Sequence, residues 1–154
     1  TLDGRNYALD GDDESGDLGI NVTGRLNITI KNISLIDDFG VGIPFTSVNY
    51  SVIDDVSLRS SNGGINLASG SSHNQISNIT ITLMTANGIS VISGSNNNTF
   101  TNINSGTISD LSDAGISVAS HNNRFTGIIT NANGDGINIV GTNNTFTNFF
   151  NFLS

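Results

Sequence analysis

The densest group of acidic side chains lies near the N-terminal end of the chain, in the stretch "DGDDESGD" over residues 10–17. Carboxylate oxygens are the ligands that calcium prefers, and this run supplies Asp10, Asp12, Asp13, Glu14 and Asp17. An EF-hand loop starting at Asp10 would need glycine one place earlier than it occurs, and a glutamate at the twelfth position, where none stands. The run is therefore a calcium candidate without EF-hand spacing. A solvated loop is the interpretation that we favour for it.

Two pairs of adjacent carboxylates, Asp37–Asp38 and Asp54–Asp55, invite comparison with glycoside hydrolases, which place two carboxylates across a sugar bond. The repeat described below puts the pairs at different corners of the fold, with Asp37 near Ser60, so that no general acid faces a general base. A lyase would also need a clustered base, but the basic residues are scattered along the chain: Arg5, Arg25, Lys31, Arg59 and Arg124. We expect no catalytic residues, and interpret the pairs as turn residues.

These candidates are positioned by a repeat that runs through the chain in several columns. One column is a Gly-Ile-x-apolar phrase with steps of 23, 22, 24, 27 and 21 residues: "GINV" at 19, "GIPF" at 42, "GINL" at 64, "GISV" at 88, "GISV" at 115 and "GINI" at 136. Two more apolar columns lie about ten residues further on: Ile30, Ile53, Ile76, Phe100, Phe125 and Phe146, and then Ile33, Val56, Ile79, Ile103, Ile128 and Phe149. Independent columns with one period indicate a solenoid.

Alternation within each repeat identifies the kind of solenoid. Ile20 and Val22, or Ile65 and Leu67, are separated by one residue, which is typical of a strand with one buried face. Turn-forming residues bound each short strand, and a coil of 21–27 residues would hold about three strands. Neither the leucine consensus nor the helix of a leucine-rich repeat is present. We predict an all-β chain that forms one domain over residues 1–154, a single-stranded parallel β-helix of about six coils.

Polar side chains also recur in register. Asn74, Asn98, Asn123 and Asn144 are expected to stack as a ladder at one corner, where amides can hydrogen-bond from coil to coil. A second corner ladder is predicted to hold Asn32, Asp55, Asn78 and Asn102. Asparagine suits both places because it tolerates the left-handed backbone of a sharp corner.

Composition narrows the classes of partner. The formal net charge is −8, which disfavours nucleic acid and anionic membranes, and no apolar run approaches the ~20 residues that span a bilayer. The chain has no cysteine, so disulfides and thiol chemistry are excluded. Because it begins at Thr1 without a signal-like segment, we expect a mature product or an excerpt of a longer chain.

Seven Asn-x-Ser/Thr sequons occur, a number near chance for a chain so rich in these residues. Asn32 and Asn78 fall in the second corner ladder, where a glycan would be hard to fit. The candidates for glycosylation are the other five: Asn21, Asn27, Asn49, Asn97 and Asn143.

The opening "TLDGRNYALDGDD", followed by "GINVTGRLNITIKNISL", resembles the repeats of right-handed parallel β-helix proteins: NosD-like periplasmic proteins, pectate-lyase-like enzymes and archaeal or bacterial surface proteins. The resemblance implies right-handed coiling and a secreted or cell-surface location. That superfamily contains lyases, hydrolases, adhesins and structural envelope proteins, so fold alone does not assign an activity. A copper site would need several His, Met or Cys ligands together, but His73 and His121 lie two coils apart and Met84 is the sole methionine. We expect no resident metal or cofactor, apart from the calcium candidate above.

The two ends of the solenoid are the remaining candidate site. A repeat exposes unpaired backbone and apolar side chains at each end unless a cap covers them. This chain enters the repeat almost directly at Leu2 and ends in "FTNFFNFLS". Phe150 and Phe152 could fold over the last coil as a plug. Alternatively, Phe149, Phe150, Phe152 and Leu2 form interfaces for further copies of the chain, and we favour that interpretation.

Three function classes follow. We favour a non-enzymatic structural protein of the cell exterior, a self-assembling subunit of a surface layer, sheath or fibre that is glycosylated at its sequons. The alternative is a carbohydrate-binding or adhesive module, which is disfavoured because the outward strand positions lack an aromatic platform for sugars. A polysaccharide lyase or hydrolase comes third because no site is evident.

Overall fold

The computed structural model describes residues 1–12, 16–108, 113–132 and 134–151. Every regular element in these ranges is a β-strand. The strands are β1 (Leu2–Asp10), β2 (Val22–Thr23), β3 (Thr29–Asp37), β4 (Val41–Thr46), β5 (Val52–Arg59), β6 (Gly63–Ala68), β7 (Gln75–Thr82), β8 (Ile89–Val91), β9 (Thr99–Ile108), β10 (Ile116–Val118), β11 (Arg124–Ala132), β12 (Ile137–Ile139) and β13 (Thr145–Asn151).

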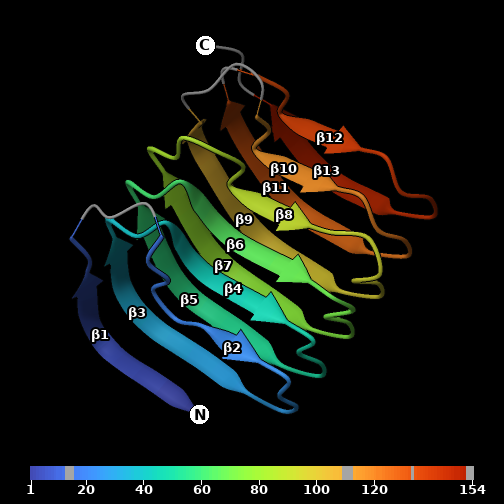
Figure 1. Cartoon of the computed structure of the whole chain (residues 1–154). Coiled ribbons are helices and arrows are strands. Elements are labelled where there is room, and N and C mark those ends of the chain that lie inside the picture. Colours follow the sequence, from blue (N-terminus) through green and yellow to red (C-terminus); the bar gives the residue numbers. More distant parts are fainter. Residues whose placement is uncertain (13–15, 109–112, 133, 152–154) are drawn as a thin grey trace.

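The strands form two parallel sheets that face each other. The first holds the long strands in the order β1-β3-β5-β7-β9-β11-β13, and the second holds the short ones in the order β12-β10-β8-β6-β4-β2. In Figure 1 each coil runs up the far sheet of long strands and returns along the near sheet, while the chain advances from lower left to upper right. This path is a right-handed β-solenoid of about six coils, as predicted.

Among the described residues, each coil contains two strands and not three. The long strands bend at one residue whose φ is positive and which takes no part in the pairing: Lys31 pairs with Asp54 and Ile33 with Val56, while Asn32 and Asp55 between them have φ of 55° and 56°. The bend divides the strand into two arms without interrupting the sheet. The expected third strand is therefore the second arm of a bent one.

Pairing between coils confirms the predicted apolar columns. Ile30, Ile53, Ile76, Phe100, Phe125 and Phe146 are successive register partners, and so are Ile33, Val56, Ile79, Ile103, Ile128 and Phe149. The register of Asp37 was one residue wrong, because its partner is Arg59 and not Ser60.

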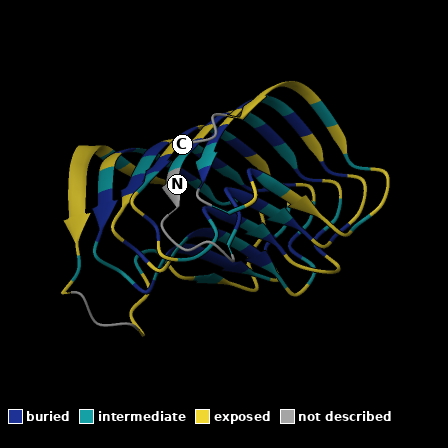
Figure 2. Cartoon of the chain, turned by 90° about the horizontal axis from the view of Figure 1, so that it is seen from above, coloured by how far each residue is buried: buried dark blue, intermediate teal, exposed yellow. Residues whose placement is uncertain are grey.

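The core consists of these columns together with the inward residues of the second sheet, such as Ile65 and Leu67. Phe100 and Phe125 are fully buried, and their rings stack with centroids 4.5 Å apart; Phe125 stacks in the same way on Phe146. Figure 2 shows buried residues alternating with exposed ones along the inner strands, whereas β1 is exposed over almost its whole length. The alternation places one face of every inner strand inside the coil.

The glycine of the Gly-Ile phrase is explained by close packing. A Cβ added to Gly42 would lie 2.3 Å from Leu58 Cδ2, and one added to Gly88 would lie 2.2 Å from Ser105 Oγ. These glycines lie at the start of the second sheet, where the backbone contacts side chains of the long strands. A larger residue would clash there, so only glycine fits. The Gly-Ile phrase therefore recurs because its glycine packs against a long strand and its isoleucine, from Ile43 onward, belongs to a strand of the second sheet.

The first asparagine ladder is present, and it is buried except at Asn144, which is half-buried. The Asn98 Oδ1 accepts the Asn74 N–H at 2.9 Å, the Asn123 Oδ1 accepts the Asn98 N–H at 2.8 Å, and the Asn144 Oδ1 accepts the Asn123 N–H at 2.8 Å. These residues do not adopt the left-handed backbone that was expected of them. The residue before each does, with Asn97, Asn122 and Asn143 near 56–59°. Their side-chain hydrogen bonds, and not their backbone tolerance, thus account for the asparagines.

Candidate functional site

At the N-terminal end, the first rung leaves the edges of both sheets open among the described residues. β1 pairs only with β3, and β2 only with β4. Leu2 stands in the column of Ile30 and Tyr7 in the column of Ile33, yet they are 46% and 77% exposed. The N-terminal end face therefore presents inward-column side chains with no rung above them.

β1 is held to β3 by a polar network as well. The Asp3 carboxylate accepts the Arg5 N–H at 3.0 Å and the Asn32 Nδ2–H at 3.1 Å, and Lys31 Nζ lies 3.5 Å from it. These contacts, that with the Arg5 N–H foremost, lower the pKa of Asp3 below its usual value. The stabilisation they give is present above the pKa of the unfolded chain and is lost as pH falls through the lower folded value.

The C-terminal end face is built in the same way. In the part of the chain that the structure describes, β13 pairs only with β11, and β12 only with β10. Phe149 continues the column of Ile128 and is 39% exposed, while Ile139 continues the column of Val118 and is 46% exposed. Phe146 is half-buried because its outer ring face has no further rung against it.

The two end faces carry the opposite ends of the same columns. Leu2 begins the column that Phe146 ends, and Tyr7 begins the column that Phe149 ends. Stacking one end on the other would continue the parallel sheets and the apolar columns together. Chemically, the two faces can add a strand to an open edge and bury apolar side chains beside it.

Phe150 does not belong to the end face. It pairs with Ile129, both side chains are exposed, and Ile129 lies between the inward residues Ile128 and Thr130. Phe150 therefore points outward from the side of the long-strand sheet, and it neither plugs the last coil nor extends its core. Phe152 lies outside the described residues.

Tyr7 and Ile139 were not identified from the sequence as members of the end faces. The signal was weak because the acidic run lengthens the first coil: Leu2 precedes Ile30 by 28 residues, beyond the 21–27-residue period of the other coils. Tyr7 precedes Ile33 by only 26 residues, because the pairing shifts register on both sides of Tyr7, so no single step extends both columns backward.

The two aspartate pairs have different partners. Asp54 accepts the Ser77 Oγ–H at 2.6 Å and the Asn78 Nδ2–H at 2.9 Å, beside the second ladder. Asp37 is buried at the end of β3, where Arg59 donates to its Oδ2. Hydrogen bonding to Asp37 is the main reason why the pKa of Arg59 is raised. The two pairs thus occupy different positions in the coil.

The acidic run is only partly described. Asp10, Asp12 and Asp17 are exposed, whereas Asp13 and Glu14 lie outside the described residues. Asp10 ends β1, where its register partner is Asp37. The sequence did not predict this pairing, because the register between β1 and β3 shifts twice before it.

The histidines take part in side-chain stacking and in hydrogen bonds between coils. The His73 ring stacks on Tyr50 at 4.9 Å between centroids, and His121 Nδ1 accepts the Thr142 N–H at 3.0 Å. The two histidines do not occupy equivalent positions. His73 has a positive φ, whereas His121 lies one residue before the positive-φ position of its own coil, where its N–H donates to the Asn96 Oδ1.

Four of the five glycosylation candidates are exposed: Asn21, Asn27, Asn97 and Asn143. Asn49 is half-buried, and its Oδ1 accepts the Ser72 N–H at 2.8 Å, which holds the amide against the next coil. Asn78 is held in the second ladder through Asp54 and Asn102. Asn78 is exposed as well, but these hydrogen bonds hold its amide, so glycan attachment is least hindered at Asn21, Asn27, Asn97 and Asn143.

Comparison of the chain with models of protein families, with curated proteins and with solved structures gives no match. The likeness to NosD-like and pectate-lyase-like repeats therefore stays an expectation beyond the solenoid architecture itself. Among the described residues, no helix is long and apolar enough to cross a membrane.

Proposed function

We propose that this chain is a non-enzymatic structural subunit of the cell exterior that assembles end to end into a surface layer, sheath or fibre. The observation that carries the proposal is the match between its two ends. The column from Tyr7 to Phe149 finishes in an exposed side chain at both ends, and the column from Leu2 to Phe146 finishes in an exposed leucine at one end and a half-buried phenylalanine at the other.

The partner is a second copy of the chain, because its N-terminal face carries the same columns as the C-terminal face of the first copy. All strands are parallel, so β1 of one copy can pair with β13 of another in the direction that every inner pair already has. Such an interface joins two different surfaces and leaves a free surface at each end, and therefore propagates. The location outside the cell rests on the family resemblance and on the exposed sequons.

Phe149→Asp tests the C-terminal face. Burying an aromatic side chain contributes about 1.5–3 kcal/mol, so the variant should weaken association roughly 10- to 100-fold. Sedimentation velocity over a range of concentrations measures this change. Phe150→Asp is the matched control, because it places the same charge on the adjacent residue but on the side of the sheet. Circular dichroism verifies that each variant is folded.

Mixing two blocked variants tests whether the interface is head-to-tail. Phe149→Asp keeps a functional N-terminal face, and Leu2→Asp keeps a functional C-terminal face. Each should be monomeric alone, and an equimolar mixture should give a dimer and nothing larger. A wild-type chain that stays monomeric at all concentrations would refute the proposal, as would equal loss of assembly in the Phe150→Asp control.

A second candidate function, binding of a neutral carbohydrate, is favoured by one observation. Phe150 flanks an outward hollow of about 350 Å³ that is also lined by Asn102, Gly127, Ile129 and Asn148. An exposed ring beside amide groups is suited to stack on a sugar and to bond its hydroxyls. This corrects the expectation that no outward aromatic exists. Retention on a panel of immobilised glycans, lost in Phe150→Ala, would support this function.

A further inference from the structure

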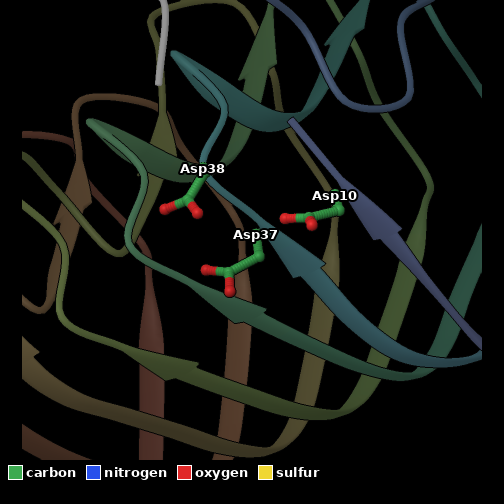
Figure 3. Close-up of side chains that lie close together, drawn as sticks. All are labelled: Asp10, Asp37 and Asp38. Carbon is green, nitrogen blue, oxygen red and sulfur yellow. The ribbon is translucent and has the colours of Figure 1, made fainter. Parts of the chain in front are cut away.

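Three carboxylates meet where the first coil joins the second. Asp10 ends β1 and is the register partner of Asp37 at the end of β3, and Asp38 follows at once. One carboxylate oxygen of each lies within 4.8 Å of one from each of the others. Figure 3 shows the Asp10 carboxylate pointing toward the other two.

The backbone is shaped to bring these groups together. The Gly11 N–H donates to the Asp37 carbonyl at 2.9 Å, and a Cβ added to Gly11 would lie only 2.2 Å from the Asp38 carbonyl oxygen. Asp38 has a φ of 60°, a conformation that turns the chain directly after β3. Glycine at 11 thus permits a close approach that no other residue would allow.

The Asp37 carboxylate is buried and only one of its two oxygens has a hydrogen-bond partner among the described residues. The residue is only 5% exposed, and Arg59 donates to its Oδ2 through both Nε and Nη2. Its Oδ1 is buried and has no hydrogen-bond partner among the described residues. A buried carboxylate oxygen without a partner is costly, and like charges directly opposite in a sheet repel each other. Arg59 offers one positive charge beside three carboxylates.

We propose that Asp10, Asp37 and Asp38 bind one calcium ion. Calcium takes oxygen ligands at 2.3–2.6 Å, so two of its ligands can lie up to roughly 5 Å apart, which fits the spacing of these oxygens. The ion would occupy the open side of the Asp37 carboxylate and tie the end of β1 to β3. Magnesium fits less well because it demands a nearly ideal octahedron and retains its water.

This site differs from an EF-hand. It joins a residue of the acidic run to two residues of the next coil, and it does not depend on whether the chain assembles end to end.

Isothermal titration of the 154-residue chain with calcium chloride tests the site. We expect one ion per chain with a Kd on the order of 10⁻⁴ to 10⁻³ M, as in extracellular modules. Calcium at ten times the Kd should raise Tm by about 3–6 °C. Asp10→Asn and Asp38→Asn should each weaken binding at least tenfold. Asp55→Asn is the control, since asparagine occupies that ladder position in neighbouring coils.

Magnesium chloride at the same concentration and ionic strength separates binding from screening. Equal Tm shifts with both salts, or calcium affinity unchanged in Asp10→Asn and Asp38→Asn chains that fold normally, would overturn the proposal. Asp37→Asn is not used because it would also disturb Arg59. Loss of calcium affinity in Asp55→Asn would equally refute the assignment, because that exposed side chain belongs to a different corner.

Discussion

Replacing Phe125 by alanine is expected to lower the free energy of unfolding by about 3–5 kcal/mol, the range for a buried aromatic that leaves a cavity. The side chain is fully buried, and its ring lies between the rings of Phe100 and Phe146, each with a centroid 4.5 Å away. The backbone above and below is paired in both directions, so the coil cannot close the cavity without breaking its register. Urea unfolding followed by circular dichroism measures the change.

Phe150→Ala is the matched control for Phe125→Ala. Phe150 lies on the outward side of the neighbouring strand and is 62% exposed, so its loss should change stability by less than about 1 kcal/mol. A loss below about 1 kcal/mol for Phe125→Ala itself would mean that its ring does not separate two rungs of the core.

The columns could be predicted from sequence because a solenoid repeats one environment. Phe100, Phe125 and Phe146 occupy the same position in successive coils, so an apolar residue is required at each of them. The spacing of these residues alone therefore reveals the register. The glycine before each Ile of the second sheet was visible for the same reason. Its cause was not, because the crowding at Gly42 comes from Leu58, a residue of another strand.

Features that depend on one coil could not be predicted in this way. The orientation of Phe150 depends on the left-handed residue Asn148, after which the inward positions are shifted by one. The sequence places Phe149 at the end of a core column, but it does not show that the adjacent Phe150 faces outward and lies apart from the end face. A three-strand coil was expected because the bend was interpreted as a turn between strands.

The acidic group shows a further limit of the repeat argument. Asp10 lies opposite Asp37 only because the longer first coil still closes onto β3, and pairing between β1 and β3 has two register shifts before that point. Counting residues across such shifts gives no single answer. From the sequence, Asp37 and Asp38 were therefore interpreted as turn residues, and Asp10 was grouped with the acidic run, for which a solvated loop was favoured over calcium binding.

The second large effect is expected from Asn98→Ala, which should cost about 2–4 kcal/mol of unfolding free energy. The side chain is 1% exposed and joins three coils: its Oδ1 accepts the Asn74 N–H, and its Nδ2 donates to the carbonyls of Ser71 and Ser95 and to the Asn123 Oδ1. Alanine would leave the buried Asn74 N–H without this acceptor, and an unsatisfied buried group costs about 1–3 kcal/mol. Water cannot readily replace the amide where the surroundings are closed.

Asn104→Ala provides the control, because Asn104 is an exposed asparagine on the same coil and its replacement should change stability by no more than about 0.5 kcal/mol. Asn144→Ala should fall between the two, since Asn144 ends the ladder half-buried and still accepts the Asn123 N–H. This order of effects, largest inside the ladder and smaller at its end, is expected if each side-chain amide accepts the backbone N–H of the ladder residue in the preceding coil. Equal losses for Asn98→Ala and Asn104→Ala would mean that the ladder adds no stability beyond that of the paired strands.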